Sequence, residues 1–112
     1  GRATRTVFRA RLAADGVLAA WETLDSLPAP RSHHAAFVHR DAIYLVGGIA
    51  ATPRDVDQLR RDVIRAPILA DGRLGAWDTV SVMDSSYVTA AAAVQGDAVY
   101  LVGGVENGRR YT

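Results

Sequence analysis

Short apolar runs separated by polar turns mark strands, not helices, along most of this chain. Residues 34–38 and 42–46 form two such runs, joined by a three-residue polar turn. Residues 63–69 and 74–80 form a second pair around an Asp-Gly dipeptide, which suits the positive φ angles of a type I′ turn. The pattern predicts two hairpins, and therefore four antiparallel strands in chain order.

The whole pattern occurs twice, at an offset of 56 residues that needs no gap. The chain has 112 residues, twice the offset, so we interpret it as two tandem copies of one structural unit. Aligned identical residues include Val7 and Val63, Arg9 and Arg65, Trp21 and Trp77, Tyr44 and Tyr100, and Gly47-Gly48 and Gly103-Gly104.

One segment offers a helical alternative. In residues 52–66, Thr52 and Pro53 suit a helix start, and apolar residues follow at helical spacing. The matching region of the other copy has no such pattern. We therefore expect at most a helical turn within a loop.

Each copy contains one nearly identical phrase, AIYLVGG at 42–48 and AVYLVGG at 98–104. Both phrases are apolar at almost every position, as in strands that are buried on both faces. The glycines lack a Cβ, so another backbone or an aromatic face can approach closely and the strand end can bulge. We expect Tyr44 and Trp77 to occupy that space.

These residues resemble the kelch repeat. The resemblance lies in Pro30-Arg31 and His34 before an apolar strand, a strand with Tyr44 ending in Gly47-Gly48, and Trp77 on a last strand. It covers the whole chain and implies an all-β fold of four-stranded antiparallel blades in a β-propeller. The second copy departs from the pattern, with Ser86-Tyr87 and Ala90 in place of Pro30-Arg31 and His34.

The family's strand order then divides the chain into three parts. Residues 33–80 would form a complete blade, residues 1–32 strands three and four of a shared blade, and residues 81–112 strands one and two of another. Fourteen residues separate Gly48 from Val63, and residues 105–112 with 1–6 also make fourteen. The end of one chain could therefore lead into the start of the next in register.

Two blades would leave apolar faces bare, so we expect partners. These are either other copies in a ring, with a trimer favoured and a tetramer possible, or the remaining blades of a longer parent chain. An excised or engineered two-blade unit is a third possibility.

Composition restricts the chemistry. The net charge of +1 gives no basic excess for nucleic acid, and no apolar run is long enough for a membrane helix. Because Cys is absent, disulfides, thiolate zinc sites and cysteine nucleophiles are excluded. The sequence predicts no cofactor and does not indicate a compartment.

The candidate ligand residues lie in the loops of one rim. Repeated around a ring, the arginine excess there could favour an anionic ligand or an acidic protein. The rim candidates are Arg2, Arg5, Arg54, Arg109, Arg110 and His33. Three copies of a histidine near a ring axis could bind a metal, but a structural role for His34 is the simpler interpretation, and we predict no metal site.

No catalytic constellation is visible. Repeated aspartates such as Asp15 and Asp71 suit turns, and we expect Trp21, Trp77, Tyr44 and Tyr100 to pack between blades. The sequence therefore favours a non-catalytic binding or scaffold module. The alternative is a fragment of a propeller enzyme, such as a sugar-processing enzyme, whose active site lies partly in missing blades.

Overall fold

The computed structural model describes residues 3–50 and 59–106, and within them the chain forms ten β-strands and no helix. The all-β, antiparallel expectation is confirmed. Four strands pair in chain order to make a sheet that we call the central sheet. These are β3 (Ala35–His39), β4 (Ala42–Val46), β5 (Asp62–Pro67) and β6 (Asp78–Val82).

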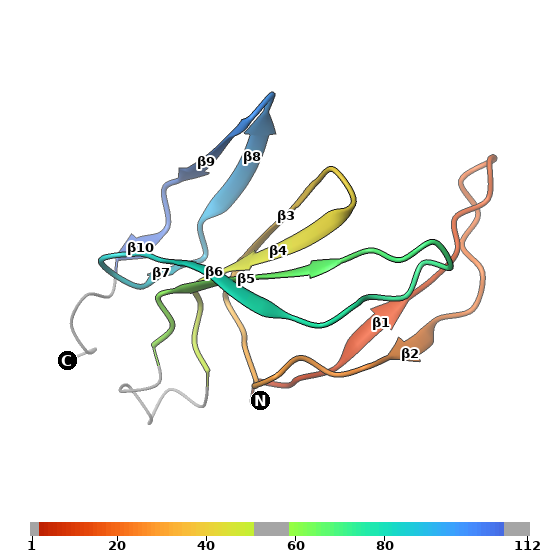
Figure 1. The fold of residues 1–112 in the computed structure, drawn as a ribbon, viewed down its shortest axis with the longest axis horizontal. Helices are drawn as coiled ribbons and strands as arrows, with labels where there is room; N and C mark the ends of the chain where they lie inside the picture. The colour runs from red at the N-terminus through yellow and green to blue at the C-terminus, as the bar shows by residue number, and fades with distance from the viewer. Residues whose placement is uncertain (1–2, 51–58, 107–112) are drawn as a thin grey trace.

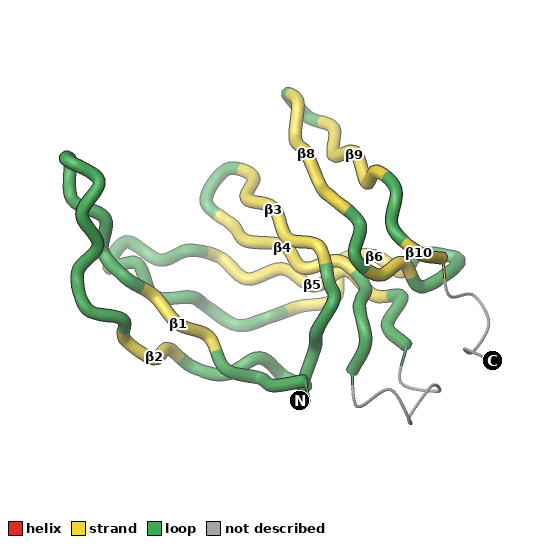
Figure 2. Tube along the Cα trace, turned by 180° about the vertical axis from the view of Figure 1, so that it is seen from behind, coloured by secondary structure: helices red, strands yellow, loops and turns green. Residues whose placement is uncertain are grey.

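Two hairpins lie on opposite sides of the central sheet (Figures 1 and 2). The N-terminal hairpin pairs β1 (Val7–Arg9) with β2 (Glu22–Leu24). The C-terminal hairpin pairs β8 (Ala91–Gln95) with β9 (Ala98–Val102), and β8 packs against β3. A short pair, β7 (Tyr87–Val88) with β10 (Val105–Glu106), adjoins the C-terminal hairpin.

Strand pairing repeats at the 56-residue spacing of the sequence. The pair Ala35–Val46 in the β3–β4 ladder has its counterpart in Ala91–Val102 of the β8–β9 ladder. The pair Arg65–Asp78 has its counterpart in Arg9–Glu22 of the N-terminal hairpin. The N-terminal hairpin therefore corresponds to β5–β6, and the C-terminal hairpin corresponds to β3–β4.

Unusual backbone angles repeat at the same spacing. His33 and Thr89 have φ values of 56° and 58°, although neither is glycine. Arg40 and Gly96 have φ values of 54° and 57°, at the tips of the two corresponding hairpins. A left-handed conformation at equivalent positions of unlike residues shows that the fold, and not the local sequence, imposes it.

The fourth strand of the central sheet begins later than the expected residue 74. An isolated bridge joins Ile68 to Leu74, but continuous pairing resumes only at Arg65–Asp78. Between these pairs the second strand has one residue more than the first, which is a bulge that interrupts the ladder. Trp77 therefore immediately precedes β6 instead of lying within it.

The turn between β5 and β6 is not the type I′ turn that its Asp-Gly dipeptide predicts. Only Gly72 has a positive φ, and its N–H donates to the Leu69 carbonyl at 2.8 Å. The Leu69 N–H in turn donates to the Arg73 carbonyl at 2.8 Å, so the loop has three residues and places glycine at its left-handed last position. Asp71 accepts a hydrogen bond from the Arg73 N–H at 3.0 Å.

The helical alternative for residues 52–66 is wrong for the part of that segment that the structure describes. Leu59 forms a bridge with Ile49, and Asp62–Pro67 is strand β5. Residues 52–58 of the segment lie outside the described residues.

The core lies between the N-terminal hairpin and the central sheet. Leu27, Leu45 and Ile64 are buried together, and Val7 and Trp77 pack against them. On the other face of the central sheet, the Phe37 and Tyr44 rings stack with centroids 4.5 Å apart. Both faces of the central sheet thus contact other parts of the chain, but its edge strand β6 is exposed along its whole length.

The molecule is more open than a compact chain of its length. Its Cα radius of gyration is 14.9 Å, whereas about 13 Å is usual for 112 residues. Its accessible surface is 7631 Å², whereas a compact 12.0 kDa monomer exposes about 6000 Å². The described residues include no helix long and apolar enough to cross a membrane.

Candidate functional site

Of the six predicted rim residues, two lie in the described part of the chain. Arg2, Arg54, Arg109 and Arg110 are outside it. Arg5 and His33 are exposed and flank the bridge between Thr4 and Arg31. His33 takes its positive φ next to Ser32, whose Oγ lies 3.0 Å from the His33 Nδ1.

A buried ion pair that the sequence did not reveal lies beside this rim. The Arg31 side chain is 3% exposed, and its Nη2 donates to Asp62 Oδ2 at 3.1 Å. Its Nη1 donates to the Gly47 carbonyl at 2.9 Å. The guanidinium therefore joins the segment before β3, the end of β4 and the start of β5. Asp62 could not be singled out in the sequence, because the charges of the aspartates and arginines in its loop cancel.

His34 lies next to this pair and immediately before β3. Burial lowers its pKa below the usual 6.5, and the positive charges of Arg31 and His33 lower that pKa further. Its Nδ1 is buried and has no hydrogen-bond partner among the described residues. The imidazole is therefore neutral at neutral pH, as expected of a packed structural histidine. The described residues contain no cluster of three or more His, Cys, Asp or Glu that could bind a metal.

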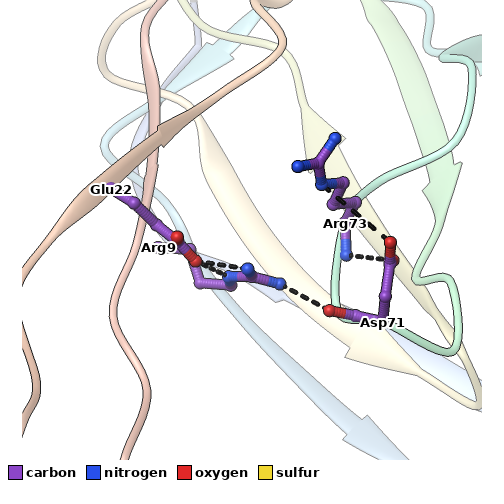
Figure 3. Close-up of polar contacts among 4 residues, drawn as sticks. All are labelled: Arg9, Glu22, Asp71 and Arg73. Atoms are coloured by element: carbon purple, nitrogen blue, oxygen red, sulfur yellow. Dashed lines mark hydrogen bonds and ion pairs between the residues drawn. The ribbon is translucent and has the colours of Figure 1, made fainter.

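A polar cavity of about 260 Å³ lies between the N-terminal hairpin and the outer end of the central sheet. Arg9 reaches across it, forming an ion pair with Glu22 and donating to the Asp71 carbonyl at 2.9 Å (Figure 3). Arg73 lies on the opposite wall, and its Nε is 3.9 Å from Asp71 Oδ2. Because these cations already have anionic or carbonyl partners, the cavity fits a structural contact between the two sheets better than an anion site.

An apolar cavity of about 190 Å³ lies on the other side, between the central sheet and the C-terminal hairpin. The stacked Phe37 and Tyr44 form one wall, with Val94 and Val99 opposite them. The Arg65 guanidinium carbon lies 5.9 Å from the Tyr44 ring centroid, at cation–π distance. Among the described residues, the lining of this cavity also includes His39 and Asp97, but no pair of carboxylates.

The double glycines need left-handed backbone, as expected, but their close neighbours are not aromatic rings. A Cβ on Gly47 would lie 2.8 Å from the Tyr87 carbonyl oxygen, and one on Gly48 2.5 Å from the Ser32 carbonyl oxygen. The expectation that Tyr44 and Trp77 fill this space is wrong, because Tyr44 stacks on Phe37 and Trp77 joins the core. The glycines instead allow the backbones at Tyr87 and Ser32 to approach.

Burial differs sharply between equivalent positions of the two copies. Ile64 is 5% exposed whereas its counterpart Phe8 is 60% exposed, and Val46 is 6% exposed whereas Val102 is 62% exposed. Trp21 and Tyr100 are also exposed, although Trp77 and Tyr44 are partly buried. The described part of the chain thus presents its largest apolar surfaces on the two outer hairpins.

In the comparisons with known proteins, no family model matches the chain, and no curated protein sequence matches it either.

Proposed function

We propose that the chain is a two-blade section of a kelch-type β-propeller, and that it serves as a binding or scaffold module. The observation that carries the proposal is the strand register, which recurs every 56 residues and yields one complete sheet flanked by two half sheets. In a propeller, each sheet packs face to face on its neighbours, and this is the relation of the central sheet to its two hairpins.

Binding is proposed over catalysis because the charged groups in the described residues hold sheets together. Arg31 and Asp62 join the segment before β3 to the end of β4 and the start of β5, and Arg9 links the N-terminal hairpin to the β5–β6 turn. Glu22 lines the polar cavity but is paired with Arg9, and Asp62 is paired with Arg31.

The loops near Arg5 and His33 are the proposed face for an anionic ligand or an acidic protein. Both residues are exposed and lie close to the bridge between Thr4 and Arg31, so they share one end of the molecule. Several copies around a ring would multiply this positive charge.

Small-angle X-ray scattering tests the propeller proposal. A closed six-blade ring of three chains should have a radius of gyration of about 20 Å. A single copy has a Cα radius of 14.9 Å. A value near that of one copy at all protein concentrations would contradict a ring built from this chain.

A further inference from the structure

We propose that strand β9 of one copy pairs antiparallel with strand β1 of a second copy, so that the two outer hairpins join into one four-stranded sheet. This inference rests on the propeller proposal and specifies its partner, its register and its selectivity. Within the described residues, β9 pairs only with β8, and β1 pairs only with β2. In the central sheet, the strands equivalent to β9 and β1 are β4 and β5, which pair directly.

The register follows from the β4–β5 ladder shifted by one repeat. Its pairs run from Ala42–Pro67 to Val46–Val63. The equivalent pairs, with the first residue from one copy and the second from its neighbour, are Ala98–Arg11, Val99–Ala10, Tyr100–Arg9, Leu101–Phe8 and Val102–Val7. This register places Tyr100 opposite Arg9, just as Tyr44 lies opposite Arg65.

The same shift assembles a second core. In the central sheet, Leu27, Leu45 and Ile64 are buried with Val7 and Trp77 around them. Their counterparts in the joined sheet are Met83, Leu101 and Val63 from one copy with Phe8 and Trp21 from the next. Phe8 and Trp21, which are 60% and 65% exposed in one copy, thereby gain a buried position.

The second copy also fits the space at Gly103. Gly47 and Gly103 have similar positive φ values of 63° and 70°, but only Gly47 has a close neighbour, the Tyr87 carbonyl oxygen. One repeat later, the group equivalent to that carbonyl is the Arg31 carbonyl of the neighbouring copy. In one copy no atom of the described residues, apart from Gly103 and its chain neighbours, lies within 4 Å of the Cβ position of Gly103. The approach of a neighbouring copy on assembly would explain why glycine is needed there.

A charged pair within one copy and a neutral pair at the joint determine which sheet a neighbouring N-terminal hairpin can enter. Arg31 and Asp62 pair within one copy, whereas their counterparts at the joint would be Tyr87 and Thr6. If a foreign N-terminal hairpin displaced β5 and β6, Thr6 would replace Asp62 and leave buried Arg31 without a carboxylate. Leaving a buried charge unpaired is strongly unfavourable, so the hairpin should join the C-terminal half sheet instead.

Disulfide trapping tests the pairing, because the chain has no Cys. One preparation carries A10C alone and a second, distinguished by a small mass tag, carries V99C alone. The two are mixed in denaturant, refolded together, oxidised with copper phenanthroline and separated on a non-reducing gel. We expect a prominent A10C–V99C heterodimer, because opposite residues in an antiparallel pair lie within disulfide reach.

The matched control mixes A10C with L101C. Leu101 faces the same side of the sheet but is displaced by two residues, a separation of about 7–8 Å. We expect at least fivefold less heterodimer from this mixture. Circular dichroism of each single variant, and native mass spectrometry of each mixture, establish that the chains are folded and assembled.

The outcomes separate the two proposals. An assembled mixture in which A10C–V99C does not cross-link, or in which A10C–L101C cross-links equally well, would overturn the strand pairing and leave the propeller proposal standing. Folded chains that stay monomeric would also overturn the pairing between copies, and the propeller proposal would then require other blades of a longer chain to complete the sheet.

Discussion

At the scale of single residues, the ion pair between Arg31 and Asp62 is the clearest polar anchor in the described structure. It is buried on the arginine side and also satisfies the Gly47 carbonyl, at the point where β4 ends. The equivalent positions of the other copy hold uncharged residues, Tyr87 for Arg31 and Thr6 for Asp62. The two positions therefore change together, as expected when they meet in space.

A double-mutant cycle tests this coupling. We expect D62T to cost about 3 kcal/mol of unfolding free energy, because Arg31 remains buried without its carboxylate. The double variant R31Y/D62T should be less destabilised than the sum of the single variants by about 1–3 kcal/mol. Urea unfolding at one fixed protein concentration measures the unfolding free energy of the unchanged chain, the two single variants and the double variant.

The control cycle uses the exposed pair Arg40–Asp97, whose side chains are 77% and 87% exposed. R40Y and D97T should show a coupling below about 1 kcal/mol. Equal coupling in the two cycles would show that burial does not set the strength of the Arg31–Asp62 pair.

At the scale of elements, the equivalent hairpins β5–β6 and β1–β2 differ in their neighbours and therefore in their burial. The β5–β6 pair lies in a four-stranded sheet with Ile64 buried, whereas the N-terminal hairpin pairs the equivalent residues at Phe8 and Arg9 and exposes Phe8. Apolar residues follow the same pattern in both. The difference lies in what covers the strand edge, because β4 pairs with β5 whereas β1 pairs only with β2 in the described part of the chain.

Two matched tryptophans separate folding from assembly. W77A should destabilise the chain by about 3 kcal/mol, because Trp77 packs on the buried Leu45 and Ile64. W21A should change the stability of one copy by less than about 1 kcal/mol, since Trp21 is 65% exposed. It should nevertheless weaken assembly at least about tenfold, because an aromatic anchor is lost from the joint.

Thermal unfolding followed by circular dichroism compares the stabilities of W77A and W21A. Sedimentation velocity over a dilution series measures how strongly W21A assembles. A W21A protein that assembles as strongly as the unchanged chain would show that Trp21 is not part of an interface.

The sequence predicted the strands best where the pattern is strictly local. The expected runs 34–38 and 42–46 are observed as Ala35–His39 and Ala42–Val46. The fourth strand was placed too early, because a one-residue bulge before Asp78 depends on the opposite strand and leaves no mark in hydrophobicity. The turn type was also wrong, since an Asp-Gly dipeptide suits both two-residue and three-residue loops.

The site was predicted less well than the fold. Arg31 was visible as part of a motif, but its partner Asp62 is 31 residues away, and only the β4–β5 ladder brings the two together. The rim residues Arg5 and His33 lie at one end of the molecule, and their proposed role depends on copies arranged around an axis. Single-chain patterns carry no information about such an arrangement.

At the scale of the whole molecule, the chain has one four-stranded sheet flanked by two half sheets. Its core of Leu27, Leu45 and Ile64 lies on one side of the central sheet, and the aromatic stack of Phe37 and Tyr44 lies on the other. Its accessible surface of 7631 Å² exceeds the value usual for its mass by roughly a quarter. These features support the proposal that the chain is a segment of a propeller that further segments complete.

Native mass spectrometry tests that claim most directly, because it counts the chains in the assembled particle. Each chain has a mass of 12.0 kDa, so a six-blade ring should appear as a trimer of about 36 kDa. A tetramer of about 48 kDa would also close an even ring of eight blades. A stable, folded monomer at micromolar concentration would contradict the account.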